Sequence, residues 1–167
     1  MATITLGGNP SQTNGQLPEP GTPAPAFTLT RTDLSSASLS DYKGHKIVLN
    51  IFPSIDTGVC ATSVRKFNEE AASLENTKVL CVSRDLPFAQ ARFCAAEGLH
   101  HVESLSDFKD GSFGKSYGIE IQDGAFHGLH ARAVVVLNEE GRVVYKQLVP
   151  EIGHEPDYAE ALKHVNE

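Results

Sequence analysis

The stretch that decides the fold is Ile47-Val-Leu-Asn-Ile-Phe-Pro-Ser-Ile-Asp-Thr-Gly-Val-Cys60. Residues 47–52 form a short apolar run rich in β-branched side chains, which predicts a buried strand. Pro53 ends that strand because proline has no N–H group to donate to a sheet. Residues 61–74 then place apolar side chains at helical spacing, which predicts an amphipathic helix. These side chains are Val64, Phe67, Ala71 and Leu74.

Cys60 is therefore expected near the first turn of a helix that directly follows a buried strand, with Asp56 or Thr57 as the N-cap. Unpaired N–H groups and the positive end of the helix dipole favour an anion at this position. Because the thiolate is the nucleophilic form of cysteine, the position favours a reactive thiol. The alternative is a small buried packing residue, which is the commoner role of a free cysteine.

The residues that precede this stretch predict short strands and turns. Thr3–Leu6 alternates polar and apolar residues and is followed by a turn at residues 7–10, which predicts an N-terminal β-hairpin extension. Residues 14–26 contain four prolines and should form an extended connector. A further short strand is expected over residues 27–30, and residues 39–44 predict a turn or a single helical turn.

A second strand and a second helix are predicted after the Cys60 helix. Lys78–Ser83 is a short apolar run that indicates a buried strand. Pro87–Glu97 has proline at its first position and is followed by Gly98, the usual arrangement for a helix. Cys94 should lie near one edge of the apolar face of this helix. That face is expected to contain Phe88, Ala91 and Ala95, with Leu99 as a further candidate.

The last third of the chain predicts a hairpin and a final helix. Residues 102–106 indicate a strand, residues 111–117 a short helix, and residues 118–130 a glycine-rich loop. Residues 132–148 contain two β-rich runs around a polar turn that ends in glycine, which predicts a β-hairpin. Residues 156–165 predict a capping helix, with an acidic residue near its positive end.

The order of these elements predicts an α/β fold. A β-α-β-α sequence followed by a hairpin and a helix is the pattern of the thioredoxin fold, with a mixed central sheet and flanking helices. The length of 167 residues suits one domain, and nothing repeats or divides the chain. We therefore expect a single thioredoxin-like domain over residues 1–167.

Composition excludes several classes of function. The formal net charge of −7, without a basic cluster, argues against a nucleic-acid partner and against binding to an anionic membrane. The N-terminus has neither a basic nor an apolar segment of a signal peptide, and no stretch reaches the length of a membrane span, so we expect a cytoplasmic protein. The seven histidines lack the spacing of zinc sites, so we expect no metal and no cofactor.

The spacing Pro53-x-x-x-Thr57-x-x-Cys60 resembles the signature of the peroxiredoxins: proline, three residues, threonine or serine, two residues, cysteine. The fuller string over residues 50–67 is similar to the thiol peroxidase (Tpx) subfamily of the atypical two-cysteine peroxiredoxins. The strings Asp85-Leu-Pro-Phe-Ala-Gln-Ala-Arg-Phe-Cys94 and Ala131-Arg-Ala-Val-Val-Val136 resemble that subfamily too. The likeness extends from the first strand to the last helix, and it also implies the thioredoxin fold.

The resemblance implies an antioxidant peroxidase that reduces hydrogen peroxide and alkyl hydroperoxides. Cys60 would attack the peroxide and become a sulfenic acid, which Cys94 would resolve as an intrachain disulfide. Thioredoxin would reduce that disulfide, and the enzyme would be a homodimer. The resemblance assigns Thr57 a hydrogen bond to the sulfur or the peroxide, Arg132 a second donor role, and Pro53 the shielding of the pocket from water.

The residues themselves support or compete with these roles. Arg132 lies at the mouth of an apolar strand, where an unpaired guanidinium is costly to bury unless a thiolate or a peroxide oxygen satisfies it. An ordinary surface ion pair is the alternative for Arg132, and Arg65 is a weaker candidate cation, expected to be solvated. A disulfide between Cys60 and Cys94 joins two helices, so we expect local unwinding of one or both. Cys81, inside a strand, is the rival resolving residue and is expected only to pack.

Three other functions are alternatives to a peroxidase. A dithiol oxidoreductase normally has Cys-x-x-Cys, but Ser63 occupies the second cysteine position here. A cysteine hydrolase would need His127 or His130 as its base, with an acidic residue to orient it. A binding module without enzymatic activity would leave the set of site residues unexplained. An apolar rim that favours organic peroxides could be formed by Phe88, Phe93, Phe126 and Leu129, although core packing explains the first two equally well.

Overall fold

The computed structural model describes residues 1–166, in which two β-sheets are present. The strands are β1 (Thr3–Leu6), β2 (Asn9–Gln12), β3 (Thr28–Arg31), β4 (Ser36–Ser38), β5 (Lys46–Ile51), β6 (Thr77–Ser83), β7 (Glu103–Ser106), β8 (Ala133–Leu137) and β9 (Val143–Leu148). β1 and β2 form the predicted N-terminal hairpin, and the other strands form one sheet in the order β4-β3-β7-β6-β5-β8-β9. β5 pairs with β6 in parallel and with β8 in antiparallel orientation, so the predicted mixed central sheet is confirmed.

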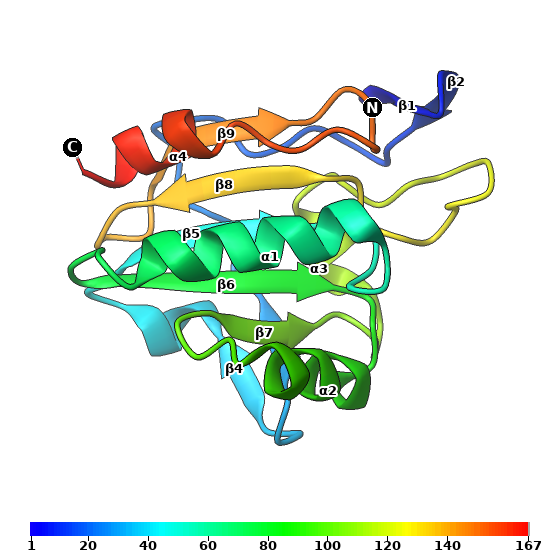
Figure 1. Ribbon diagram of the computed structural model, residues 1–167. Coiled ribbons are helices and arrows are strands. Elements are labelled where there is room, and N and C mark those ends of the chain that lie inside the picture. The colour runs from blue at the N-terminus through cyan, green and yellow to red at the C-terminus, as the bar shows by residue number, and fades with distance from the viewer. Residues whose placement is uncertain (167) are drawn as a thin grey trace.

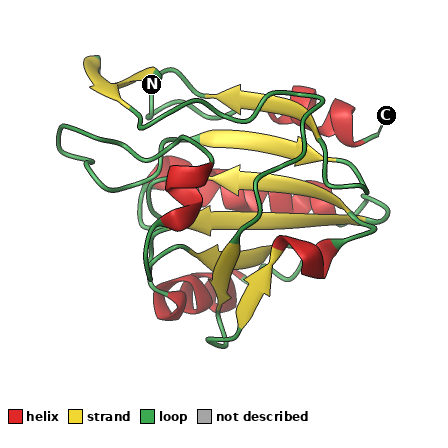
Figure 2. Cartoon of the chain, turned by 180° about the vertical axis from the view of Figure 1, so that it is seen from behind, coloured by secondary structure: helices red, strands yellow, loops and turns green. Residues whose placement is uncertain are grey.

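Helices cover both faces of the large sheet. They are η1 (Leu39–Tyr42), α1 (Gly58–Ala71), α2 (Pro87–Glu97), α3 (Ser112–Ser116) and α4 (Tyr158–Val165). Figure 1 shows α1 and α2 in front of the sheet, and Figure 2 shows α3 and the proline-rich connector on the opposite face. Within residues 1–166, every helix is too short or too polar to cross a lipid bilayer.

The central strand β5 is buried on both faces, and its side chains alternate between two cores. Val48 and Phe52 pack with Cys60 under α1, whereas Ile47, Leu49 and Ile51 belong to the core on the α3 side. A strand buried on both faces has a nearly continuous apolar sequence, which is why residues 47–52 carry so clear a signal. In the same way, Cys81 of β6 packs on the α1 side, as its strand position predicts.

The predicted inward face of α2 is wrong. Its buried residues are Pro87 and Gln90, whereas Phe88 is 66% exposed and Ala95 is also exposed. The reason lies in the strand beneath, because β7 turns Ser104 toward this helix rather than an apolar side chain. Hydrogen bonds therefore attach this helix to the sheet together with Phe93, which packs against the α1-side core. Leu99, just after the helix, packs against the same core, so the prediction holds at that one position.

The predicted hairpin over residues 132–148 is confirmed by the antiparallel pair β8–β9. Its turn is stabilised by Asn138, whose side-chain oxygen accepts hydrogen bonds from the amides of Glu140 and Arg142, both at 3.0 Å. Gly141 has φ of 78°, a left-handed conformation that glycine adopts without the steric cost of a Cβ. Asn138 and Gly141 thus explain why the sequence predicts a turn here.

Glu151 joins the N-terminal hairpin to the end of the chain. Its carboxylate accepts hydrogen bonds from the Gly153 amide (3.0 Å), the Gly8 amide (2.8 Å) and the Thr5 hydroxyl (2.9 Å), which lower the pKa of this group to about 2. Because the folded pKa lies below the ordinary glutamate value, the carboxylate stabilises this junction above about pH 4.5. That stabilisation is lost as the pH falls from there toward the folded pKa.

We therefore expect amide protection of Thr5 and Ile152, measured by hydrogen exchange and corrected for the intrinsic rate, to decline below about pH 4.5 in the wild type. The variant Glu151→Gln should have lower protection at pH 7 and no further decline assignable to this group. Glu69→Gln, a change on the exposed surface of α1, should behave like the wild type. Equal pH profiles in the wild type and Glu151→Gln would contradict this assignment.

Candidate active site at Cys60

Cys60 is the third residue of α1 and is fully buried, with 0% of its surface exposed. Thr57 is the N-cap, which confirms one of the two predicted alternatives. Its side-chain oxygen accepts a hydrogen bond from the Cys60 amide at 3.4 Å. The Thr57 hydroxyl in turn donates to the backbone oxygen of Ser54 at 3.2 Å. The sulfur therefore lies at the end of α1 where free amides and the helix dipole favour negative charge.

The loop between β5 and α1 covers the end of the sheet. β5 ends at Ile51, and Pro53 follows as a buried residue without a ladder hydrogen bond to donate. Pro53 is therefore close in the chain to both the strand end and the N-cap Thr57. The predicted strand–loop–helix arrangement around Cys60 is present in the structure.

Arg132 reaches the same edge from β8. Ile51 pairs with Ala133, so the residue before β8 lies opposite the end of β5. Arg132 is only 3% exposed, and its Nε donates to the backbone oxygen of Ile152 at 2.9 Å. Its Nη1 is buried and has no hydrogen-bond partner among the described residues. A surface ion pair, the alternative considered for this arginine, does not describe a side chain that is almost completely buried.

The unpartnered Nη1 of Arg132 indicates which kind of group this position would stabilise. Leaving a buried donor unsatisfied costs about 1–3 kcal/mol, and more when the group is charged. A buried cation of this kind is stabilised by an anion or by an oxygen with lone pairs. Tyr158 lies near enough for the Arg132 charge to act on its pKa, although burial is the larger influence and raises it.

Cys94 and Cys81 occupy different environments, and all three cysteines are free thiols. Cys94 is partly exposed on α2, with its sulfur 3.4 Å from the Ser104 hydroxyl oxygen. Cys81 is buried in β6, where the side-chain amide of Asn50 lies 3.7 Å from its sulfur. Burial raises the pKa of the Cys81 thiol to about 12, so this group stays protonated and weakly nucleophilic at neutral pH.

α1 and α2 lie side by side and contact each other through charged residues. Arg65 forms an ion pair with Glu97 and stacks over the ring of Phe93, with 5.7 Å between the guanidinium carbon and the ring centroid. Arg92 and Asp56 form a second, more exposed pair at 3.7 Å. Arg65 therefore lies on the helix surface, as predicted, and is used in contacts between the two helices that carry Cys60 and Cys94.

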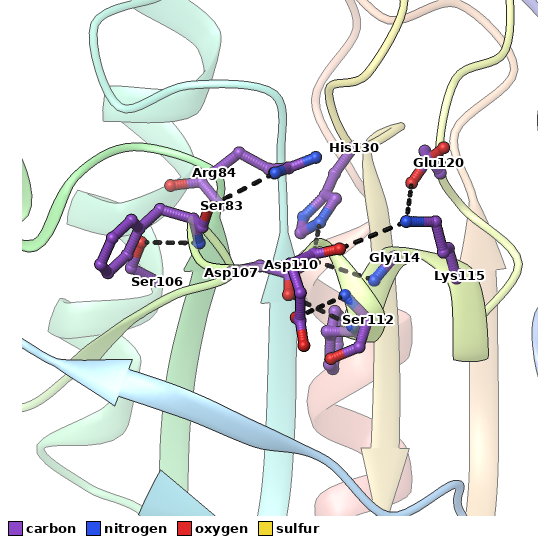
Figure 3. Close-up of polar contacts among 12 residues, drawn as sticks. Ser83, Arg84, Ser106, Asp107, Asp110, Ser112, Gly114, Lys115, Glu120 and His130 are labelled. Carbon is purple, nitrogen blue, oxygen red and sulfur yellow. Dashed lines mark hydrogen bonds and ion pairs between the residues drawn. The ribbon is translucent and has the colours of Figure 1, made fainter. Parts of the chain in front are cut away.

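His130 and Ser63, which two of the alternative functions would use, both make structural hydrogen bonds. His130 is fully buried, with Nε2 2.8 Å from a carboxylate oxygen of Asp107, which also accepts the Gly114 amide at 3.0 Å (Figure 3). The imidazole packs against the ring of Phe113, which belongs to the core on the α3 side. Ser63, at the second position of a Cys-x-x-Cys motif, donates its hydroxyl to the backbone oxygen of Cys60 at 2.8 Å. These groups stabilise the fold and offer Cys60 no base.

The four residues proposed for an apolar rim are not brought together. Phe93 packs against the core on the α1 side, whereas Phe126 packs against the core on the α3 side. Phe88 is exposed on α2. A groove of about 510 Å³ does lie over the first turn of α1, between Gly58, Val59 and Thr62 of the helix and the loop of residues 153–155.

Sequence reasoning did not single out Ser54 and Asp85, which hydrogen bond to each other across this site at 2.7 Å. Serine and aspartate in loops are most often solvated, so their identity alone gave no signal. Cavity size does not single out the site, because a second cavity of about 490 Å³, close in volume to the groove over α1, lies around Phe27 and Ile47 at the start of β5.

Comparison with known proteins agrees with this geometry. The family model described as Redoxin matches residues 19–162. The chain is 54% identical to a thiol peroxidase of Corynebacterium glutamicum, over 99% of this chain and 100% of that protein. It is 57% identical to a thiol peroxidase of Mycobacterium tuberculosis, over 97% of each chain.

Solved structures extend the likeness to the fold. A peroxiredoxin-like protein from Aquifex aeolicus superimposes with a TM-score of 0.94 at 41% identity, over 99% of this chain and 96% of that one. A thiol peroxidase from Chromobacterium violaceum has a TM-score of 0.91 at 20% identity, over 98% and 95% of the two chains, which shows the same fold. The mixed sheet, flanking helices and N-terminal hairpin thus form the thioredoxin-like peroxiredoxin fold, and the chain belongs to the thiol peroxidases, enzymes of the redoxin family.

Proposed function

We propose that this peroxidase reduces hydrogen peroxide and alkyl hydroperoxides with Cys60 as the attacking thiolate and Cys94 as the resolving thiol. The observation that carries the proposal is the pairing of two buried groups at one edge of the sheet. One is a cysteine at the first turn of α1, and the other is Arg132 with an unpartnered Nη1. A sulfur nucleophile and a buried cation at the same edge are suited to a neutral oxidant that becomes an anion as it reacts.

In the first step the Cys60 sulfur attacks the distal oxygen of the peroxide. A sulfur–oxygen bond forms as the O–O bond breaks, the sulfur becomes a sulfenic acid, and the leaving alkoxide or hydroxide takes up a proton as alcohol or water. Arg132 stabilises the charge that develops on the leaving oxygen, and the Thr57 hydroxyl turns from the Ser54 backbone oxygen to donate to the sulfur or the peroxide. Pro53 keeps water away, which strengthens both interactions.

In the second step the Cys94 thiol condenses with the sulfenic acid, giving a disulfide and one molecule of water. The two residues lie on neighbouring helices, and a disulfide requires Cα atoms within about 7 Å, so local unwinding of α2, α1 or both accompanies this step. Cys81 is a poor rival because it is buried in a strand and its pKa is raised. The partly exposed position of Cys94 supports its role, since a mobile surface helix rearranges more readily than a strand inside the sheet.

Thioredoxin is proposed to return the disulfide to two thiols, so that the protein needs no cofactor or metal. The working form is proposed to be a cytoplasmic homodimer, and residues 1–167 are proposed to form one domain. These assignments rest on the family membership and not on a partner or ligand bound to the chain. Neither nucleic acid nor membrane has a part in the proposed cycle.

Substitution of the cysteines tests this cycle directly. With thioredoxin, thioredoxin reductase and NADPH, Cys60→Ser should lose all peroxide consumption, and Cys94→Ser should reduce one equivalent of peroxide and then stop. Cys81→Ser should turn over at a rate near that of the wild type. Sustained turnover by Cys94→Ser would assign resolution to another thiol, and peroxide reduction by Cys60→Ser would overturn the proposed function.

Arg132→Met should lower kcat/KM for peroxide by about 100-fold, since one well-placed donor to a developing oxyanion is worth roughly that factor. The melting temperature should change little, because removal of a buried charge with an unpartnered Nη1 offsets loss of the Nε bond to the Ile152 oxygen. Arg65→Met, which removes an arginine from the surface of α1, is the matched control and should stay within about twofold. A loss of stability together with an unchanged rate would show that Arg132 is only structural.

Thr57→Val keeps the shape of the side chain and removes its hydroxyl. We expect the free energy of unfolding to fall by about 1 kcal/mol from loss of the N-cap, and kcat/KM to fall at least about tenfold from loss of the donor. Thr57→Ser, which keeps the hydroxyl, should preserve both quantities. Denaturant titration and steady-state kinetics measure the two effects separately, and a wild-type rate in Thr57→Val would remove Thr57 from the proposed reaction.

A further inference from the structure

Asp85 connects the Cys60 loop with the helix that carries Cys94. One carboxylate oxygen accepts the Ser54 hydroxyl at 2.7 Å, and the other accepts the Ile55 amide at 2.7 Å and the Ser83 hydroxyl at 2.6 Å. Ser54 and Ile55 belong to the loop between β5 and α1, whereas Asp85 immediately precedes Leu86, the N-cap of α2. A single carboxylate thus ties together two segments that lie 30 residues apart in the chain.

The bonds on the loop side lead directly to the reactive cysteine. Ser54 accepts the Thr57 hydroxyl through its backbone oxygen, and Thr57 accepts the Cys60 amide through its side-chain oxygen. The position of the Thr57 hydroxyl, and with it the first turn of α1, therefore depends on where Ser54 is held. Hydrogen bonds to a charged acceptor are the stronger kind, so Asp85 is suited to fix this loop.

The bonds on the other side lead into α2. The Ser83 hydroxyl donates to Asp85 and accepts from the side-chain amide of Gln90 at 3.2 Å. Gln90 also donates to the backbone oxygen of Leu105 at 3.0 Å, and its side chain is one of the two that α2 buries. Because Pro87 is the one apolar residue that α2 buries fully and Phe93 is only partly buried, polar contacts of this kind contribute to its attachment to the sheet, and elements with few buried apolar contacts open more readily.

We propose that Asp85 is a positioning residue that sets the balance between the two steps of the reaction. While its hydrogen bonds are intact, the loop of residues 53–57 is held in the geometry that reduces peroxide. Those bonds break when α2 and the loop rearrange to bring Cys94 to Cys60. This inference rests on the proposed function, in which Cys94 resolves the Cys60 sulfenic acid.

Formation of the disulfide, the step that Asp85 restrains, needs no reactant besides the Cys60 sulfenic acid and the Cys94 thiol. The Cys94 sulfur attacks the Cys60 sulfur, the S–S bond forms as the S–OH bond breaks, and the leaving hydroxide takes the thiol proton as water. The sulfenic acid is the oxidant and the Cys94 thiol is the reductant. Asp85 touches neither sulfur and acts only through the loop and the helix.

The test separates the two steps in a single turnover. Reduced protein is mixed with one equivalent of hydrogen peroxide and quenched with an alkylating agent, and intact and peptide mass spectrometry then gives the sulfenic acid and the Cys60–Cys94 disulfide. In Asp85→Asn one carboxylate oxygen is replaced by an NH₂ group that faces donors. We expect peroxide reduction to slow, and disulfide formation to accelerate, each by about threefold or more, because the loop leaves the reactive geometry more often.

A matched control is Asp123→Asn. Asp123 also accepts a serine hydroxyl and a backbone amide, from Ser11 at 2.6 Å and Gln12 at 3.0 Å, but it joins the N-terminal hairpin to the loop of residues 118–130. Both rate constants of this variant should stay within about twofold of the wild-type values. Ser54→Ala removes only one bond to Asp85 and should move both constants in the same directions as Asp85→Asn, by smaller factors, even if Asp85→Asn folds poorly.

Opposite shifts of the two rate constants are a result that a merely stabilising carboxylate would not give. The proposal is overturned if natively folded Asp85→Asn, or Ser54→Ala in its place, changes both constants in the same direction or neither of them. It is also overturned if Asp123→Asn produces the same opposite shifts. A wild-type protein that consumes peroxide without forming the Cys60–Cys94 disulfide would instead overturn the proposed second step, so the two failures are distinguishable.

Discussion

The site depends on one constraint: β5 pairs with one parallel neighbour and one antiparallel neighbour. β6 runs parallel to β5, so the two strands end at one edge of the sheet, and the antiparallel β8 begins at that edge. Figure 1 shows β6 and β7 pointing toward the side on which α1 begins. Residues that follow β5, follow β6 and precede β8 therefore lie along the same edge. They are the Cys60 loop, Asp85 and Arg132, respectively.

The two helices on the α1 face are held in different ways, and the difference suits their roles. α1 packs Val64 and Phe67 into the apolar core with Cys60, so its body is fixed by burial. α2 turns an amide side chain toward a serine-containing strand and leaves Phe88 in solvent. Hydrogen bonds can be exchanged with water at a modest net cost, whereas a packed aromatic ring cannot leave the core without a large one. In the proposed cycle the rigid element thus carries the attacking sulfur, and the looser element carries the resolving sulfur.

The sequence predicted the fold well where burial is complete and poorly where it is not. The run of residues 47–52, the hairpin of residues 132–148 and the N-cap before Cys60 all depend on local chemistry that one segment supplies by itself. The face of α2 was wrong because it depends on the side chains of β7, which are distant in the sequence. The three-residue strand β4 was also missed, since Ser36–Ser38 has no apolar pattern to distinguish it from a loop.

The candidate site divides in the same way. Pro53, Thr57 and Cys60 could be found because their spacing within one loop is itself the signal. Arg132 was noticed because a charge at the end of an apolar strand is unusual, although its unpartnered nitrogen is visible only in three dimensions. Asp85 and Ser54 could not be singled out from the sequence, because the hydrogen bonds of Asp85 to Ser54 and Ile55 join segments that are distant in the chain. His130 is the reverse case: its residue type made it a candidate base, but the structure buries it against Asp107 as part of the core.

The complete burial of Cys60 limits which reactants can reach its sulfur. A hydroperoxide is small enough to diffuse to a sulfur that has no surface, whereas the cysteine of another protein is attached to a folded body and is not. In the proposed cycle the oxidant and the reductant therefore use different entrances, one through the interior and one at the partly exposed Cys94. This separation keeps the sulfenic acid away from foreign thiols, so that the oxidising equivalent is passed on only after it has moved to the surface.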